Sequence, residues 1–226
     1  MKKFILTSLI LICMVVICVC ASFVSEAVHE YKAENAYYDN VSKESIAGSG
    51  IDFDSLRKEN TDIIGWIKIQ GTRINYPIVQ AENNDKYLHT LFSGKPGNSG
   101  CIFADCRNDS FKSTLSIIYG HRMKDGSMFS DIGRYKSRSF ADMHRDISID
   151  TPDKSYKLKI VLFATIGANN IVYNEYFTSA MSVYDLLKRH AHYAYSKPKN
   201  NEKLVMLSTC AYEFKNARYV LLCKLQ

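Results

Sequence analysis

The sequence lacks the residue clusters that mark several large classes of protein. No block of lysines and arginines interleaved with aromatic residues occurs, and the formal net charge of +6 is spread over 226 residues. Nucleic-acid grooves need such a basic, stacking surface, so nucleic acid is not an expected partner. No C-x-x-C or H-E-x-x-H motif and no acidic cluster is found. We therefore predict no metal site and no cofactor.

The seven cysteines do not form the closely spaced framework of a small disulfide-rich domain. Three of them lie in an apolar N-terminal segment, where they serve as apolar side chains: Cys13, Cys18 and Cys20. The other four lie further along the chain: Cys101, Cys106, Cys210 and Cys223. An even number permits disulfides in an extracellular domain. A domain of this size also folds without them, so all four can be free thiols.

The N-terminal apolar segment is long enough to cross a membrane. Phe4–Val24 contains 21 residues without a charge, which spans roughly 30 Å as a helix. A cleaved signal peptide is the alternative, because "VCA" at 19–21 resembles a cleavage site, but its apolar core would be shorter. Lys2 and Lys3 precede the segment. Positive residues stay on the cytoplasmic side, so we predict a single-pass protein of the cell membrane with its body outside the cell.

The composition divides the chain into three parts. Residues 1–26 are predicted to form the anchor (or signal peptide), and the polar residues 27–50 a stalk that ends in Gly-Ser-Gly. Residues 51–226 are predicted to form one mainly β domain. In that part, short runs rich in β-branched and aromatic residues alternate with turn residues, which is typical of a barrel or sandwich. The expected strands are 63–69, 74–80, 100–105, 115–121, 146–150, 156–167, 171–177, 203–210 and 218–225.

Three helices are expected between these strands. A short one fits residues 52–60 with Asp52 or Asp54 as its cap, and another fits 128–135. The third covers 178–196, where apolar side chains recur at steps of three and four residues after Thr178 or Ser179 as the cap.

The stretch "VMLSTCAYEFKNARYVLLCKL" at 205–225 predicts a β-hairpin with chemistry at its open end. If the turn centres on Phe214, Cys210 pairs with Arg218, and cross-strand neighbours have Cβ atoms about 5 Å apart. A thiol nucleophile needs a nearby base or cation and a donor for the oxyanion, which a guanidinium can supply. A cysteine that ends an apolar strand is also commonly a small buried hydrophobe. The hairpin alone leaves both interpretations open.

One histidine stands where a catalytic base is often found. His121 follows the apolar run "TLSIIYG" at the start of a loop, so a rigid strand would hold it. The other five histidines are in the stalk, in the expected late helix or in polar surroundings: His29, His89, His144, His190 and His192.

Three separated motifs together resemble the sortases, the cysteine transpeptidases of Gram-positive surfaces. They are "SIIYGHRM" with His121, "MLSTC" with Cys210 and "RYVLL" with Arg218. The family hallmark is T-L-x-T-C, and Met206 replaces its first threonine here. "GWIKI…INYPIVQAENNDKYLHTLFSG" is similar to the class B branch, as is the long helix before the Cys strand. The resemblance covers about residues 50–226. It implies a closed sortase-type β-barrel of about eight strands, with N-terminal helices and that inserted helix.

The resemblance also implies roles for individual residues. Cys210 would attack the threonine carbonyl of a five-residue C-terminal sorting signal, His121 would serve as general acid and then base, and Arg218 would hold the carbonyl and stabilise the oxyanion. The acceptor would be an amine of a cell-wall peptide, so that a surface protein becomes joined to peptidoglycan. Residues expected to contact the substrate are Ser208, Thr209, Asn84 and Leu88.

Two other functions are compatible with parts of the sequence. A membrane-tethered extracellular cysteine peptidase would also use Cys and His, although papain-like enzymes place Cys before His in the chain and here His121 comes first. A non-catalytic β-domain that binds a partner would keep Cys210 as a buried side chain. Rapid, site-selective labelling of Cys210 by a thiol reagent distinguishes an enzyme from the binding domain.

Overall fold

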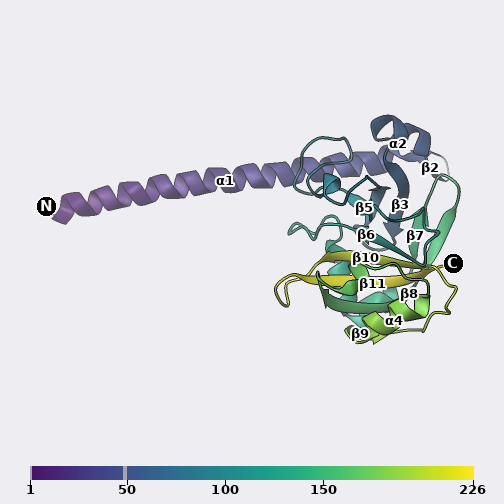
Figure 1. The fold of residues 1–226 in the computed structure, drawn as a ribbon. Helices are drawn as coiled ribbons and strands as arrows, with labels where there is room; N and C mark the ends of the chain where they lie inside the picture. The colour runs from purple at the N-terminus through teal and green to yellow at the C-terminus, as the bar shows by residue number, and fades with distance from the viewer. Residues whose placement is uncertain (1, 48–49) are drawn as a thin grey trace. The chain divides into compact units, whose positions relative to one another are not determined.

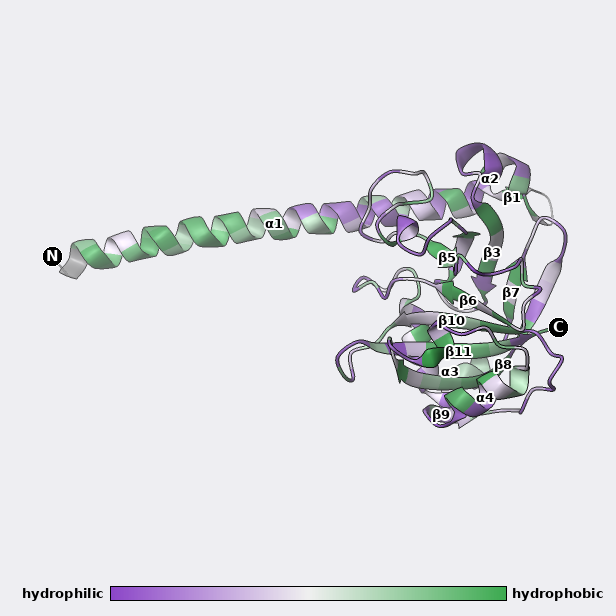
Figure 2. Cartoon of the chain, viewed as in Figure 1, coloured by the Kyte–Doolittle hydropathy of each residue, from purple (hydrophilic) through white to green (hydrophobic). Residues whose placement is uncertain are grey.

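The computed structural model describes residues 2–47 and 50–226, so two residues of the predicted stalk lie outside the described residues. The chain divides into two compact units, residues 1–40 and 41–226. The first unit is helical: α1 (Lys2–Glu44) continues without a break through most of the predicted stalk. Figure 2 shows apolar residues along the first half of α1. In the described part of the chain, one helix is long and apolar enough to cross a membrane, which fits an N-terminal anchor.

The second unit is mainly β, as the strand pattern predicts (Figure 1). Its strands are β1 (Ile46–Ala47), β2 (Gly50–Ile51), β3 (Ile63–Ile69), β4 (Asn75–Val79), β5 (Ile102–Ala104), β6 (Leu115–Tyr119), β7 (Ile147–Asp150), β8 (Ser155–Gly167), β9 (Ala191–Ala194), β10 (Leu204–Cys210) and β11 (Ala217–Leu225). Its other helices are α2 (Phe53–Glu59), α3 (Arg138–Met143) and α4 (Ala180–Lys188), with 3-10 turns η1 (Lys86–Leu88), η2 (Ser130–Lys136) and η3 (Ile171–Tyr173).

Eight of the described strands close into a barrel. The order is β11-β10-β6-β5-β4-β3-β7-β8, and β11 also pairs with β8, which completes the ring; β9 adds to the free side of β8. Closure removes the unpaired edges that an open sheet would expose. The closed eight-stranded barrel predicted from the resemblance is therefore confirmed.

The strands form because their inward-facing side chains are apolar and become buried. Ile67 in β3, Ile78 in β4 and Ile118 in β6 have no exposed surface. Outside the barrel, α4 buries Val183 and Leu187 in a second apolar cluster with side chains of β8, β10 and β11. The barrel and its covering helix thus hold β10 from both faces.

Two sequence predictions for the segment between β8 and β10 are wrong. Residues 171–177 do not form a strand: they begin with η3, which Asn170 caps by accepting a hydrogen bond from the Val172 amide at 3.0 Å. The helix expected over 178–196 ends at Lys188, and residues 191–194 form β9 against β8 instead. The predicted cap is confirmed, because the Ser179 hydroxyl accepts a hydrogen bond from the Ser182 amide.

The two short helices have the expected places. The Asp52 carboxylate caps α2 by accepting the Ser55 amide at 3.0 Å. The helix predicted over 128–135 is present as the 3-10 turn η2, which covers Ser130–Lys136, while Met128 pairs with Arg122 in a β-bridge instead.

Candidate active site

The pairing of three adjacent strands brings the predicted catalytic residues into one row. In the antiparallel β10–β11 hairpin, Cys210 lies directly opposite Arg218, so the predicted register is confirmed. In the parallel β6–β10 pair, Ser208 lies opposite Tyr119. Cys210 ends β10 two residues after Ser208, and His121 comes two residues after Tyr119, just beyond the end of β6. Residues opposite one another point to the same face of a sheet, so Cys210 and Arg218 lie on one face, and His121 lines the same cavity as both.

Gly120 allows His121 to sit at the end of β6. Its amide donates a hydrogen bond of 3.2 Å to the Ser208 carbonyl, which continues the strand pairing by one step. A Cβ atom at this position would lie 2.4 Å from Cδ1 of Ile102 and 2.8 Å from the ring of Phe129. Only glycine fits such a close approach, and the chain leaves the strand immediately after it.

One ring nitrogen of His121 is held by the backbone. His121 Nε2 lies 2.7 Å from the carbonyl oxygen of Leu88. A carbonyl can only accept a hydrogen bond, so Nε2 carries a proton. Nδ1 is therefore the nitrogen that can take up and release a proton. The ring of His89 stacks against the His121 ring with centroids 5.7 Å apart, which further restricts its rotation.

A cavity of about 560 Å³ lies next to His121, Cys210 and Arg218, and every site residue predicted from the sequence lines it. The predicted residues that line it are Asn84, Leu88, His121, Ser208, Thr209, Cys210 and Arg218. Apolar and polar side chains from other elements complete the wall, among them Phe103, Tyr119 and Tyr173. Its volume falls in the range of small-molecule binding sites.

The predicted substrate-binding residues differ in whether their polar groups already make hydrogen bonds within the protein. The Asn84 side chain accepts the Cys106 amide at 2.8 Å and donates to Asp105 at 3.2 Å, so it holds the framework as well as lining the cavity. The Ser208 hydroxyl is buried and bonded to the Tyr173 hydroxyl at 2.8 Å. The buried Thr209 hydroxyl has no hydrogen-bond partner within the described part of the chain.

A buried carboxylate behind the cavity wall escaped the sequence analysis. Asp105 is 1% exposed and accepts two hydrogen bonds of 2.8 Å from the Arg107 guanidinium and one of 2.9 Å from Tyr119. Burial alone would raise the pKa of Asp105, but these hydrogen bonds hold it below the usual value. Arg107 also donates to the Tyr173 carbonyl, so the ion pair supports the turn that carries Tyr173. The position of Asp105 directly after a buried strand was the available sequence signal.

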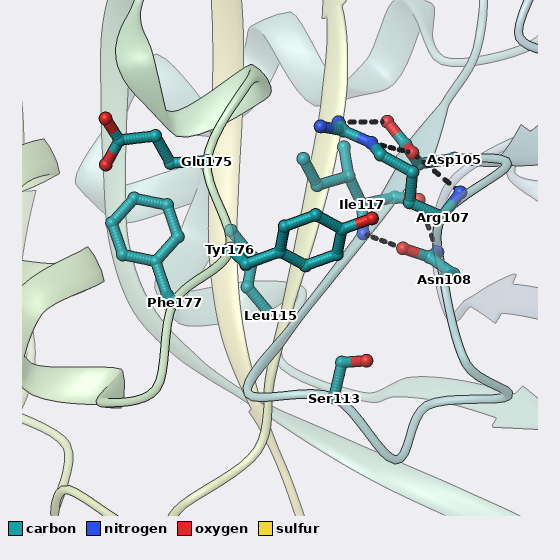
Figure 3. Close-up of a pocket in the computed structure, with 9 residues that line it drawn as sticks. All are labelled: Asp105, Arg107, Asn108, Ser113, Leu115, Ile117, Glu175, Tyr176 and Phe177. Carbon is teal, nitrogen blue, oxygen red and sulfur yellow. Dashed lines mark hydrogen bonds and ion pairs between the residues drawn. The ribbon is translucent and has the colours of Figure 1, made fainter.

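Figure 3 shows this ion pair among the residues that line a second, smaller cavity of about 50 Å³, which Tyr176 also lines. Asp105 and Arg107 line it together with Asn108. The Asn108 side chain makes two hydrogen bonds to the backbone of Ile117 in β6. Its amide nitrogen donates to the Ile117 carbonyl at 2.8 Å, and its oxygen accepts from the Ile117 amide at 3.1 Å. The ion pair and Asn108 therefore brace β6, the strand that leads to His121.

Tyr173 is the second residue that sequence analysis missed, because its segment was predicted to be a strand. Burial raises the pKa of its hydroxyl to about 12, so the hydroxyl stays protonated at neutral pH.

The environment of Cys223 differs sharply from that of Cys210. Its side chain has no exposed surface, and burial raises the pKa of its thiol well above the usual value.

Comparison with known proteins agrees with this geometry. Residues 67–226 match the model of the sortase domain. The chain belongs to the sortase family. It is 33% identical to sortase B of Listeria monocytogenes over 177 residues, which cover 75% of this chain and 72% of that protein. It is 31% identical to sortase B of Staphylococcus aureus over 182 residues, or 76% of this chain and 74% of that one.

Solved structures of sortases show the same fold. The Staphylococcus aureus sortase B–substrate complex superposes with a TM-score of 0.78 at 28% identity, covering 88% of this chain and 98% of that one. Sortase B of B. anthracis in complex with AAEK1 gives 0.76 at 31% identity, with coverages of 88% and 98%. This sortase is thus of class B, and sortases are cysteine transpeptidases that act on sorting signals.

Proposed function

We propose that Cys210 is the nucleophile of this sortase and that His121 and Arg218 serve it in two successive acyl transfers. The observation that carries the proposal is the convergence of the three residues on one cavity, with Cys210 and Arg218 opposite one another on β10 and β11 and His121 just beyond the end of β6. A base, a thiol and a fixed cation at one cavity form the minimum set for thiol acyl transfer.

In the first transfer, the Cys210 thiol passes its proton to His121, and the sulfur attacks the carbonyl carbon of the threonine in a five-residue sorting signal. The carbonyl oxygen becomes an oxyanion, which the Arg218 guanidinium stabilises. When the C–N bond breaks, His121 gives a proton to the leaving amine. The surface protein is then held as a thioester on Cys210.

In the second transfer, an amine of a cell-wall peptide attacks the thioester. His121 accepts a proton from that amine, the C–S bond breaks and Cys210 is restored. The new amide joins the surface protein to peptidoglycan. Nδ1 of His121 is the atom that exchanges the proton in both transfers, since Nε2 remains bonded to the Leu88 carbonyl.

The cavity wall supports binding of an extended peptide. Asn84 and Leu88 stand on one loop of the wall, Ser208 and Thr209 on β10. We assign these four residues to the sorting signal.

The membrane topology belongs to the same proposal. Lys2 and Lys3 keep the N-terminus in the cytoplasm, and the apolar part of α1 spans the bilayer. The barrel then lies on the outer face, next to both substrates. In a spheroplast assay, protease added from outside should digest the barrel domain, and protection of that domain would refute this orientation.

Trapping the thioester tests the reaction. The full chain in detergent, incubated with a sorting-signal peptide and no amine, should gain the mass of the peptide's N-terminal part on the tryptic fragment that contains Cys210. Adding an amine acceptor should release a ligated product rather than the free acid. Hydrolysis alone, unaffected by acceptor amine, would instead indicate a peptidase.

A further inference from the structure

Three side chains stack on one another close to the catalytic residues. Each of them belongs to a residue that follows one of the three catalytic residues in the sequence. The Arg122 guanidinium carbon lies 5.0 Å from the ring centroid of Tyr212 and 5.2 Å from that of Tyr219. Arg122 follows His121, Tyr219 follows Arg218, and Tyr212 comes two residues after Cys210. We call Tyr212, Arg122 and Tyr219 the Arg122 stack.

The stack lies outside the cavity that holds the catalytic row. Successive side chains of a strand point to opposite faces, so Tyr219 points away from the face on which Arg218 lies. Among the described residues that line the cavity, no member of the stack is found. The stack therefore affects the reaction through its neighbours and not by touching the peptide.

Other contacts fix the stack to the body of the protein. Glu213, beside Tyr212, accepts hydrogen bonds from the Tyr219 hydroxyl and, at 3.0 Å, from Lys136 at the end of η2. A Cβ atom added at Gly133 in η2 would lie 3.2 Å from the Tyr219 ring and 3.5 Å from Nε of Arg122. The η2 turn thus packs closely on the stack and leaves it little room to shift.

The strand pairing does not by itself hold His121 beside Cys210. The last paired residues of β6 and β10 are Tyr119 and Ser208, and the Gly120 amide makes the final hydrogen bond of 3.2 Å to β10. Beyond that point β10 continues to Cys210 beside β11, whereas His121 and Arg122 leave β10 and pair with residues 128 and 129, where the Phe129 amide donates a hydrogen bond of 2.9 Å to the His121 carbonyl. The Arg122 stack is a side-chain contact that connects the segment after β6 with the segment after β10, immediately after the catalytic residues.

We propose that Arg122 is a positioning residue that, through its two aromatic contacts, sets the placement of His121 relative to Cys210. The planar guanidinium is suited to lie between two rings, which a lysine ammonium cannot imitate with the same geometry. This inference rests on the proposed roles of His121 and Cys210. A small misplacement of a proton-transfer group costs rate rather than substrate affinity, so the loss should appear in kcat.

The test compares Arg122→Ala, Arg122→Lys and Tyr212→Ala in the full chain in detergent. Tyr212 is 71% exposed, so its removal leaves the core intact. The matched control is Arg138→Ala, which removes a guanidinium 5.3 Å from the ring of Tyr195, away from the cavity. With a sorting-signal peptide, Arg122→Ala and Tyr212→Ala should lower kcat about tenfold to a hundredfold and leave KM within about twofold. The kcat of Arg122→Lys should lie between the values of these two variants and that of the wild type. The kcat of Arg138→Ala should equal that of the wild type.

A second readout needs no peptide. The rate of iodoacetamide alkylation at Cys210, followed by mass spectrometry of its tryptic fragment, should fall in the same order among the variants, because the thiol depends on its histidine. If the peptide is not cleaved at all, the proposed function fails while this measurement still tests the stack. A kcat within twofold of the control in Arg122→Ala, a change in KM alone, or full restoration of kcat by Arg122→Lys would each overturn the inference.

Discussion

Cys210 faces Arg218 across the β10–β11 hairpin, and the second thiol of the hairpin, Cys223, pairs with Val205 in the same ladder. The two cysteines share a residue type and a strand pair but not an environment. Cys210 lines the cavity, whereas Cys223 is fully buried.

Replacing each thiol should therefore give opposite results. Cys210→Ala should abolish cleavage of a sorting-signal peptide, because in the described part of the chain no other thiol lies opposite Arg218. Cys223→Ala should keep nearly full activity and lower the free energy of unfolding by about 1 kcal/mol, the cost of a small cavity. Peptide cleavage and urea unfolding measure the two effects. Full activity in Cys210→Ala would remove the basis of the mechanism.

Replacing His121 and replacing Arg218 should lower kcat/KM by different factors. His121→Ala should lower kcat/KM by about 10²- to 10⁴-fold, the range for a general acid–base group. Arg218→Ala should lower it by about 10²- to 10³-fold, as for loss of one oxyanion donor. Arg218→Lys should recover only part of that loss, because it keeps the charge but not the planar fork of donors. Equal rates for Lys and Ala at position 218 would show that charge does not contribute.

The sequence predicts the catalytic row well because strand pairing follows simple rules. A turn centred on Phe214 places Cys210 opposite Arg218, and the structure confirms this pairing. His121 is distinguished from the other histidines because it follows a buried strand and a glycine, and it lines the same cavity as Cys210 and Arg218. These are local signals, carried by a few neighbouring residues.

The sequence predicts the segment between β8 and β10 poorly because tertiary contacts decide it. Residues 191–194 continue the spacing of α4, yet they pair with β8, where Tyr193 lies opposite Phe163. The segment after Asn170 has strand-like residues, but a side-chain cap starts a turn there instead. Tyr173 reaches Ser208 only because of that turn. Asp105 also follows a buried strand, but its pairing with Arg107 and Tyr119 depends on buried surroundings that the sequence alone does not show.

The Asp105 carboxylate should make the stability of the fold depend on acid pH. Its pKa is lower in the folded protein than the ordinary value of 3.8. Such a group stabilises the fold above its unfolded pKa, and this contribution is lost as pH falls through the folded pKa. Asp105→Asn should therefore destabilise the protein at neutral pH by about 2 kcal/mol, less than a fully buried pair because Arg107 is partly exposed.

Unfolding by urea between about pH 6 and about pH 2 checks this prediction. The difference in unfolding free energy between wild type and Asp105→Asn should shrink as pH falls. Asp153→Asn, at an exposed position, is the control and should follow the wild type at every pH. A difference that stays constant with pH would mean that Asp105 does not titrate as proposed.

The hydrogen bond between Tyr173 and Ser208 should be visible in a double-mutant cycle. Their hydroxyl oxygens lie 2.8 Å apart at the cavity wall. Tyr173→Phe and Ser208→Ala each remove one partner and leave the other unpaired, so each should lower kcat/KM by about fivefold, or about 1 kcal/mol. The double variant should lose little more than either single one, because both changes break the same bond. Tyr195→Phe, whose hydroxyl bonds to Asp142 away from the cavity, serves as the control and should combine additively with Ser208→Ala. Additive losses for Tyr173 and Ser208 would show that the two hydroxyls act on the peptide separately.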